Sequence, residues 1–570
     1  MRLCDLSTPF EKDGDDWTEY PRPQMKRDSY ISLCGKWELS VKKKEKETIL
    51  GEIIVPYPPE SRISGINRPF AKDEQYIYRK RFTLPENFNK GKILLHFGAV
   101  DQFAVVYLNG RALGGHNGGY LPFSFDITSL VKADENFVEV FVTDKLDTDY
   151  PYGKQRYKRG GMWYTPISGI WQAVWLESVP ENYIRDLKIT PSLDSVSIDV
   201  TGGSGEKTIT VHTEKGNIIS SFSGSTADIK IPEPICWTPE APYLYYFTIT
   251  DGEDRIESYF ALRTIKTERK KDRSYICLNG RPYFFHGVLD QGYFSDGIYT
   301  PASPKGYEYD ILTMKKLGFN MLRKHIKIEP DLFYYYCDKY GMIVFQDMVN
   351  SGKYNFFTDT ALPTIGLKKG IKCWASKRRR AIFERSAEET VNLLFNHPSV
   401  CYYTIFNEGW GQYDADRIYK KMKQLDGTRV WDSTSGWFKE NHSDVDSEHI
   451  YFKKIKLTAI PERPLVLSEF GGYSCKIENH SFNLDKNYGY KMFDSEKALN
   501  EGIRSLYMDE VIPAVKDGLS ATVLTQLSDV EDETNGLVTY DRQIIKVDEK
   551  MMQEMSRKIQ TDFGKALSDN

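Results

Sequence analysis

Two glutamates in the sequence each follow directly after an apolar run. Asn407-Glu408 comes after CYYTIF, and Glu469 comes after RPLVLS. A carboxylate at the end of a buried strand is costly unless it is paired or lines a cavity. Glycoside hydrolysis needs two facing carboxyl groups, one to protonate the departing oxygen and one to attack the anomeric carbon or activate water. The alternative interpretation is that each glutamate forms a structural ion pair with a nearby arginine.

The elements that must position these glutamates alternate between strand and helix. After about residue 267, we count eight apolar strand candidates with helical patterns between several of them: PYFFHGV, FNMLRKH, MIVFQD, VCYYTIFNE, TRVWDSTS, SEHIYF, PLVLSE and ATVLTQL. Eight such units over about 300 residues predict a (β/α)8 TIM barrel. An open doubly wound sheet is the alternative, but no Gly-rich phosphate loop follows a strand. In a barrel, strands four and seven end on one face, so their glutamates can meet across its mouth.

The first half of the chain has a different pattern. Short alternating segments, with Asn109-Gly110 as a hairpin turn, predict an N-terminal β jelly-roll sandwich in residues 1–180. Residues 181–266 carry a second set of short strands and are long enough for an immunoglobulin-like β-sandwich. With the barrel in residues 267–570, the sequence predicts a multidomain protein of three parts.

Composition excludes several classes of function. The formal net charge of -4 argues against nucleic acid as a partner, because such binding needs a basic face. The eight cysteines are scattered, which makes a disulfide framework or zinc site improbable. No apolar run approaches the roughly 20 residues of a membrane helix, and residues 1–16 lack an apolar core of a signal peptide. We therefore expect a cytoplasmic protein that binds neither membranes nor nucleic acid.

Several segments resemble glycoside hydrolase family 2, which includes β-galactosidases, β-glucuronidases and β-mannosidases. GMWYTPISGIWQAVWLE and VPYPPESRISGI are similar to its N-terminal domain, WTPEAPYLY to its middle domain, and RPLVLSEFGG to its nucleophile strand. The resemblance covers nearly the whole chain. It implies that Glu408 is the general acid/base, that Glu469 is the nucleophile, and that Asn407 binds the sugar 2-hydroxyl.

Further strand-end residues are candidates for binding the substrate. The resemblance implies that Tyr451, in the segment His449-Ile450-Tyr451, hydrogen-bonds Glu469 and keeps it ionised. It also places Arg323 beside the nucleophile. The remaining candidate contacts are His325, Asp347, His449 and Trp437. Trp431, Asp432 and residues 526–535 are further candidates to line the same mouth, without individual roles. Tyr451 could instead be a core tyrosine, and His325 and Asp347 could be structural. We also expect Glu408 to have the higher pKa of the catalytic pair.

Motifs late in the barrel bear on the identity of the sugar. The family's glucuronidases carry Asn-any-Lys late in the barrel, and no such motif follows Glu469 here. A β-galactosidase-like, retaining, exo-acting enzyme is therefore the main hypothesis. A β-glucuronidase or other uronidase is the alternative, with Lys324 or Lys327 supplying the cation that a buried carboxylate needs. A non-catalytic carbohydrate-binding protein on the same scaffold is the alternative from another class.

Three further expectations complete the prediction. The His-rich segment of the largest β-galactosidases is missing, so their magnesium contacts cannot be carried over, and we expect no cofactor or metal. The partner is a carbohydrate substrate, and a homo-oligomer is possible because relatives commonly form one. The stretch 348–378 is longer than usual, and it either narrows the mouth or is a surface elaboration or oligomer contact.

Overall fold

The second half of the chain forms the predicted parallel eight-stranded barrel. The computed structural model describes residues 3–10, 17–365, 367 and 375–569. The hydrogen-bonded sheet has the order β27-β26-β25-β24-β23-β32-β29-β28. Read around the barrel from β23 through β27 and β28 to β32, this is the order of the strands in the chain. Its strands are β23 Phe285–Asp290, β24 Met321–Lys324, β25 Ile343–Asp347, β26 Val400–Asn407, β27 Val430–Ser435, β28 Asp446–Ile450, β29 Leu465–Gly471 and β32 Leu519–Thr525.

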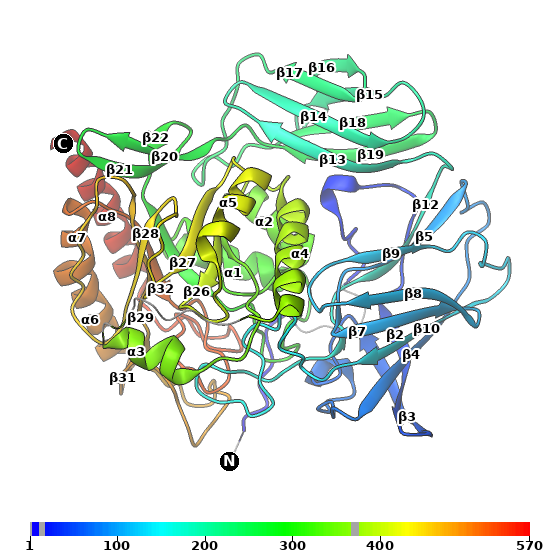
Figure 1. The fold of residues 1–570 in the computed structure, drawn as a ribbon, viewed down its shortest axis with the longest axis horizontal. Helices are drawn as coiled ribbons and strands as arrows, with labels where there is room; N and C mark the ends of the chain where they lie inside the picture. The colour runs from blue at the N-terminus through cyan, green and yellow to red at the C-terminus, as the bar shows by residue number, and fades with distance from the viewer. Residues whose placement is uncertain (1–2, 11–16, 366, 368–374, 570) are drawn as a thin grey trace.

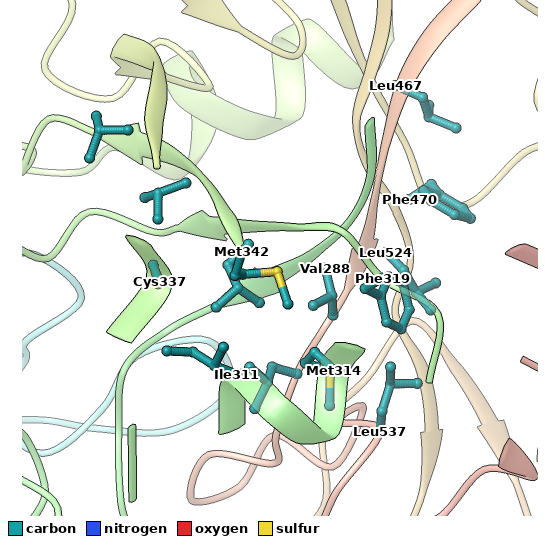
Figure 2. Close-up of a cluster of buried hydrophobic side chains, with 14 of the residues drawn as sticks. Val288, Ile311, Met314, Phe319, Cys337, Met342, Leu467, Phe470, Leu524 and Leu537 are labelled. Atoms are coloured by element: carbon teal, nitrogen blue, oxygen red, sulfur yellow. The ribbon is translucent and has the colours of Figure 1, made fainter. Parts of the chain in front are cut away.

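Helices cover the outside of this barrel. They are α1 Lys305–Lys316, α2 Asp331–Tyr340, α4 Lys377–Leu394, α5 Ala415–Leu425, α6 Glu496–Leu506, α7 Ile512–Lys516 and α8 Glu549–Asp569. Figure 2 shows Val288 of β23 and Leu524 of β32 beside Ile311 and Met314 of α1, all within one buried cluster. Strand residues on both faces are buried, as expected for a parallel sheet between helices and a filled interior.

The N-terminal part is a sandwich of two antiparallel sheets. One contains β1 Tyr30–Ser32, β12 Val174–Val179, β5 Lys92–Phe97 and β9 Phe123–Asp126. The other contains β3 Lys46–Val55, β2 Gly35–Lys43, β4 Glu74–Phe82, β10 Asn136–Thr143, β7 Phe103–Leu108 and β8 Arg111–Asn117. Burial alternates along β10, where Val138, Val140 and Val142 are 0% exposed. This period of two fixes which face of the strand joins the core.

The middle part is a second, smaller sandwich, which Figure 1 shows above both neighbours. Its sheets contain β13 Ile184–Pro191, β14 Ser195–Gly202 and β17 Thr226–Lys230, and β16 Ile218–Ser223, β15 Thr208–His212, β18 Tyr245–Asp251 and β19 Asp254–Phe260. Tyr259 of β19 donates a hydrogen bond of 2.8 Å to Asp338 of α2. The predicted fold class is confirmed. The domain boundaries stay a proposal, and the one at 266/267 lies inside β20 (Ile265–Lys270).

A segment of the N-terminal part, residues 146–164, packs on the carboxyl end of the barrel. The Tyr152 hydroxyl donates to the Gly352 carbonyl at 2.9 Å, and its backbone N–H donates to the Asn350 carbonyl at 3.1 Å. Tyr164 donates to the carboxylate of Glu533, which follows β32. The N-terminal part is therefore in a position to contribute side chains to the barrel mouth. In the described residues, no helix is long and apolar enough to cross a membrane.

Candidate active site

The carboxylates of Glu408 and Glu469 lie together at the carboxyl ends of the barrel strands. Glu408 follows β26 directly, and Glu469 belongs to β29. His449, in β28, places its Nδ1 2.9 Å from Glu408 Oε1 and 3.6 Å from Glu469 Oε2. One oxygen of each glutamate and a nitrogen of this histidine lie within 4.8 Å of one another. The barrel thus brings the two sequence candidates into one site.

A strained turn fixes the direction of Glu408. Its φ is +53°, a left-handed conformation that is uncommon for a residue with a side chain, and Gly409 follows at +74°. The Glu408 N–H donates to the Ser435 carbonyl at 3.0 Å. A side chain at position 409 would collide with the Phe438 ring, so glycine is required there. The turn therefore holds Glu408 toward His449.

Arg323 connects most of the predicted site residues. It is 1% exposed, and its guanidinium donates to Glu469 Oε1, Asn407 Oδ1 and Ser435 Oγ at 2.9 Å each. It also donates to Asp347 Oδ1 at 3.0 Å. Arginine suits this position because its planar fork can satisfy several acceptors at once. Arg323 thereby fixes the geometry of the nucleophile candidate and of the asparagine.

The surroundings of Glu469 favour its ionised form. Burial raises the pKa of Glu469, but the electrostatic pull of His449, Arg323 and His325 and a hydrogen bond from Tyr451 outweigh burial and lower the pKa to about 2. Tyr451 donates to Glu469, and its hydroxyl lies 3.0 Å from Thr525 Oγ1. The predicted contact between Tyr451 and Glu469 is present in the structure.

Asp347 and His325 are buried and form a hydrogen bond with each other instead of facing open solvent. His325 Nδ1 lies 2.7 Å from Asp347 Oδ2, and the other oxygen of Asp347 accepts from Arg323. Burial raises the pKa of Asp347, but the charge of Arg323 and the contact with His325 lower it overall. Both carboxylate oxygens are thus engaged, which makes Asp347 a group that positions Arg323 and His325.

The side chain of Asn407 is held with its amide nitrogen available. Its Oδ1 accepts hydrogen bonds of 2.9 Å from Arg323 and from Ser435. Among the residues that the structure describes, the amide nitrogen has no hydrogen-bond partner. The amide can therefore donate to a ligand in the mouth.

The two tryptophan candidates, Trp431 on β27 and Trp437 after it, lie in different surroundings. Trp437 is half-buried, and its ring centroid lies 6.3 Å from that of His449, beside the glutamates. Trp431 is 0% exposed and donates from Nε1 to the Asp426 carbonyl at 2.8 Å. Trp431 therefore belongs to the barrel wall, and the expectation that it lines the mouth is wrong.

Sequence reasoning missed Lys154, which comes from the N-terminal part. Its side chain is half-buried, and its charge acts on His325 and Glu533. Across the described ranges, the Lys154 ammonium makes no hydrogen bond or ion pair. Lys154 lies in a loop of another domain and not at a barrel strand end, so no local sequence pattern reports its position near the mouth.

The stretch 348–378 contributes to the mouth through Tyr354. The Tyr354 ring lies 5.0 Å from that of Trp163 and 6.2 Å from that of Trp410. Positions 366 and 368–374 of this stretch lie outside the described residues. Tyr354 thus packs against the N-terminal part and the turn after β26. The role of the whole stretch stays a prediction.

Glu408, His449 and Glu469 also have the spacing of a metal site. However, Arg323 donates to one oxygen of Glu469 and Tyr451 donates to the other. A cation would have to displace these donors and approach a permanently charged guanidinium. The donor set therefore fits proton transfer and nucleophilic attack better than metal binding.

Models of known protein families match three parts of the chain. Residues 62–193 match the galactose-binding domain-like part of glycosyl hydrolase 2, and residues 182–263 match glycosyl hydrolases family 2. Residues 270–560, half of the chain, match the TIM barrel domain of glycosyl hydrolases family 2.

Individual proteins are similar over large parts of the chain. A β-galactosidase of Thermoanaerobacter pseudethanolicus is 29% identical over 62% of this chain and 48% of its own length. The human β-glucuronidase is 23% identical over 62% of this chain and 58% of its own. The chain thus spans about half the length of these relatives.

Solved structures have the same fold. A β-D-glucuronidase of Dictyoglomus thermophilum superposes with a TM-score of 0.75 at 19% identity, covering 94% of this chain and 98% of that one. A β-galacturonidase of Eisenbergiella tayi, bound to galacturonate, has a TM-score of 0.69 at 19% identity, with coverages of 95% and 99%. All three parts of the fold therefore occur together in known proteins.

The low pKa of Glu469 predicts a change in acid stability. Because the folded-state pKa lies near 2, ionised Glu469 contributes stability that is fully present above about pH 4.5 and lost as the pH falls toward 2. In Glu469→Gln this contribution is absent, so the melting temperature should fall less between about pH 5 and pH 3 than in the parent. Glu86→Gln, at an exposed position, is the matched control. Identical pH profiles for Glu469→Gln and the parent would contradict the assignment.

Proposed function

Because the chain belongs to glycoside hydrolase family 2, we propose that it is a retaining, exo-acting β-glycosidase that removes terminal β-linked sugars by double displacement. One observation carries this proposal: oxygens of Glu408 and Glu469 lie within 4.8 Å of each other. Retaining glycosidases hold their two carboxyl groups about 5–5.5 Å apart, and inverting ones about 6.5–9.5 Å apart. The short separation leaves no room for water between the glutamate and the sugar.

In the first step, Glu469 acts as the nucleophile. It is ionised, and Arg323 and Tyr451 hold its two oxygens in place. Its carboxylate attacks the anomeric carbon while Glu408 donates its proton to the departing glycosidic oxygen. The carbon–oxygen bond to the leaving group breaks, and an ester bond to Glu469 forms.

In the second step, Glu408 acts as a base. Forming the ester removes the negative charge of Glu469, so the deprotonated form of Glu408 no longer faces a neighbouring anion. Glu408 takes a proton from water, the water oxygen attacks the anomeric carbon, and Glu469 leaves as a carboxylate. The available amide nitrogen of Asn407 is placed to donate to the sugar 2-hydroxyl throughout.

For the sugar, we propose a β-galactoside as the main substrate. The relative at 29% identity is named a β-galactosidase, and the chain has no Asn-any-Lys motif after Glu469. A carbohydrate substrate, a cytoplasmic location and a homo-oligomer remain parts of the proposal. A non-catalytic binding protein would release no nitrophenol from 4-nitrophenyl β-glycosides, so that assay separates the two classes.

A uronidase is the second candidate, and the charge of Lys154 near the mouth favours it. The two lysines suggested by the sequence, Lys324 and Lys327, are engaged elsewhere. Lys324 Nζ lies 2.6 Å from Asp290 Oδ2 and is 1% exposed, so it is unavailable to a substrate. Lys327 Nζ donates to the carbonyls of Gly292 and Tyr299 at 2.6 and 2.7 Å. Among the described residues, Lys154 is a further cation near the mouth, since its charge acts on His325 and on Glu533. It could pair with a sugar carboxylate.

The roles of the two glutamates can be tested by chemical rescue. Glu469→Gly should lose activity by about 10³-fold or more, and added azide should restore turnover to the glycosyl azide of inverted configuration. Glu408→Gly with azide should give the azide of retained configuration, because its nucleophile is intact. Glu448→Gln in β28, whose carboxylate pairs with Lys439 at 2.8 Å, serves as the control with parental activity. The opposite pair of products would swap the assignment.

The sugar preference can be tested through Lys154. We expect the parent to cleave 4-nitrophenyl β-galactoside faster than the glucuronide and galacturonide. Lys154→Met should lower kcat/KM for the two uronides by about 10-fold or more, since a charge-assisted hydrogen bond is lost. The galactoside should change by less than about threefold. Lys154→Arg, which keeps the charge, is the matched control. An equal loss of kcat/KM on all three sugars would show that Lys154 does not recognise the sugar carboxylate.

A further inference from the structure

The N-terminal sandwich has a cavity of its own, of about 200 Å³, and the described residues that line it all belong to this domain. Glu60 reaches the cavity from the loop after β3, Asp144 from the end of β10, and Tyr157 from the loop that follows β10. Phe70 and Tyr157 give it an aromatic wall. A cavity of this size can hold a small organic molecule, since one of about 150 Å³ holds benzene.

Three acidic side chains at this cavity have hydrogen bonds but no matching cation. Asp144 is 3% exposed, and its Oδ1 accepts a hydrogen bond of 2.6 Å from a backbone N–H. Glu60 accepts from the hydroxyl and the N–H of Ser168 at 2.6 and 3.1 Å. Asp101 is 2% exposed, and the charges of Asp144 and Glu60 act on it. Within the described ranges, none of the three carboxyl groups forms an ion pair.

The second oxygen of Asp144 is the acceptor most clearly left over. Among the described residues, no N–H group and no hydroxyl donates to it. Burial raises the pKa of Asp144 to about 7, and burial together with the charge of Asp144 raises the pKa of Glu60 to about 8. A buried carboxylate without a cation is costly, and a cation beside it offsets that cost. The cavity therefore offers acceptor oxygens whose ionised form needs a positively charged partner.

The chain itself places one cation at the edge of this cavity. The Lys72 ammonium lies 4.6 Å from the centre of the Tyr157 ring, and its charge acts on Asp144. Lys72 is exposed and Tyr157 is 42% exposed, so this contact lies on the open side of the cavity. A cation is attracted to the face of an aromatic ring. The position of Lys72 thus indicates where a positive group is stabilised, with the carboxyl oxygens behind it.

The arrangement fits an organic ammonium ion better than a metal ion. A divalent metal needs several oxygens that converge on one point at about 2.0–2.6 Å. In the part of the chain that the structure describes, the three carboxyl groups do not bring one oxygen each within 4.8 Å of one another. An ammonium group donates up to three hydrogen bonds to separate acceptors, and its carbon chain can lie along an aromatic wall.

We propose that this cavity binds a small primary amine in its ammonium form, with Glu60 and Asp144 as acceptors and the Tyr157 ring over the charge. Asp101 adds negative charge from behind the two acceptors. Lys72 partly occupies the position of the ligand's ammonium group and competes with it. The site lies in a different domain from Glu408 and Glu469 and does not depend on the proposed glycosidase activity.

Calorimetry on the full chain tests the site with 1,4-diaminobutane and with its neutral analogue 1,4-butanediol. The parent should bind the diamine at least about 10-fold more tightly than the diol, because charge-assisted hydrogen bonds are made only by the amine. Asp144→Asn, which keeps the shape of the side chain, should weaken diamine binding by about 10-fold. Lys72→Met should strengthen it by about threefold or more, because a competing ammonium group is removed. Asp134→Asn, exposed in the loop before β10, should leave it unchanged.

The pH dependence of diamine binding gives a second readout. Because the ligand binds the ionised carboxyl groups, its affinity should rise by about 10-fold or more between pH 6 and pH 8 and level off above that range. Lys72 and Arg159, the cations beside the cavity, are of residue types that keep their charge over this range. Asp144→Asn should flatten the rise.

The outcomes that overturn the proposal are distinct from a failure of the enzyme assignment. Equal affinity of the parent for diamine and diol overturns it, and so does diamine binding that Asp144→Asn leaves unchanged. Diamine binding that is lost in Glu469→Gln would place the amine in the barrel mouth and also overturn the site. Because Lys72 is exposed, Lys72→Met tests the site even where Asp144→Asn does not fold. A Lys72→Met variant that binds the diamine no more tightly than the parent contradicts the assigned position of the ammonium group.

Discussion

The buried guanidinium of Arg323 is the interaction on which the geometry of the mouth depends. Moving a charge out of water costs several kcal/mol, and this cost is offset only when hydrogen bonds and opposite charges surround the ion. Arg323 meets that condition with Asp347, Glu469, Asn407 and Ser435, which lie on four different barrel strands. The strand positions around the barrel and the positions of the reacting groups are therefore fixed together. A lysine could not replace it, because a single ammonium group cannot reach acceptors spread over this arc.

The N-terminal sandwich is part of the mouth rather than a separate appendage. Tyr152 and Tyr164 attach the segment 146–164 to the barrel through hydrogen bonds on both sides of the opening. Between them lie Lys154, whose charge acts on His325, and Trp163, whose ring packs against that of Tyr354. In the proposed function, the barrel supplies the reacting carboxylates, while the sandwich places Lys154 and Trp163 near the mouth. Under this proposal, selectivity and catalysis are carried by different domains, and a substitution in the sandwich alters one without the other.

The sequence predicts the barrel and its glutamates because both leave local signals. All eight strand candidates are strands in the structure, and an acidic residue after an apolar run is visible without knowing the fold. Trp431 shows the limit of this reasoning, since its position one residue into β27 places its side chain in the wall. Lys154 shows a second limit. It lies in a loop whose path depends on contacts far apart in the chain, and no periodic pattern reports such contacts.

The network around Arg323 also explains how the site keeps its shape when the charge of the nucleophile changes. In the proposed mechanism, ester formation on Glu469 removes one of the two anions that face the guanidinium. Asp347 remains, and the charge of Arg323 and the contact with His325 hold its pKa low, so it stays ionised through both steps. Arg323 therefore never becomes an uncompensated buried charge, a state that would cost about 3–5 kcal/mol. Because Arg323 also holds Asn407, the sugar-facing amide keeps its direction from the first displacement to the second.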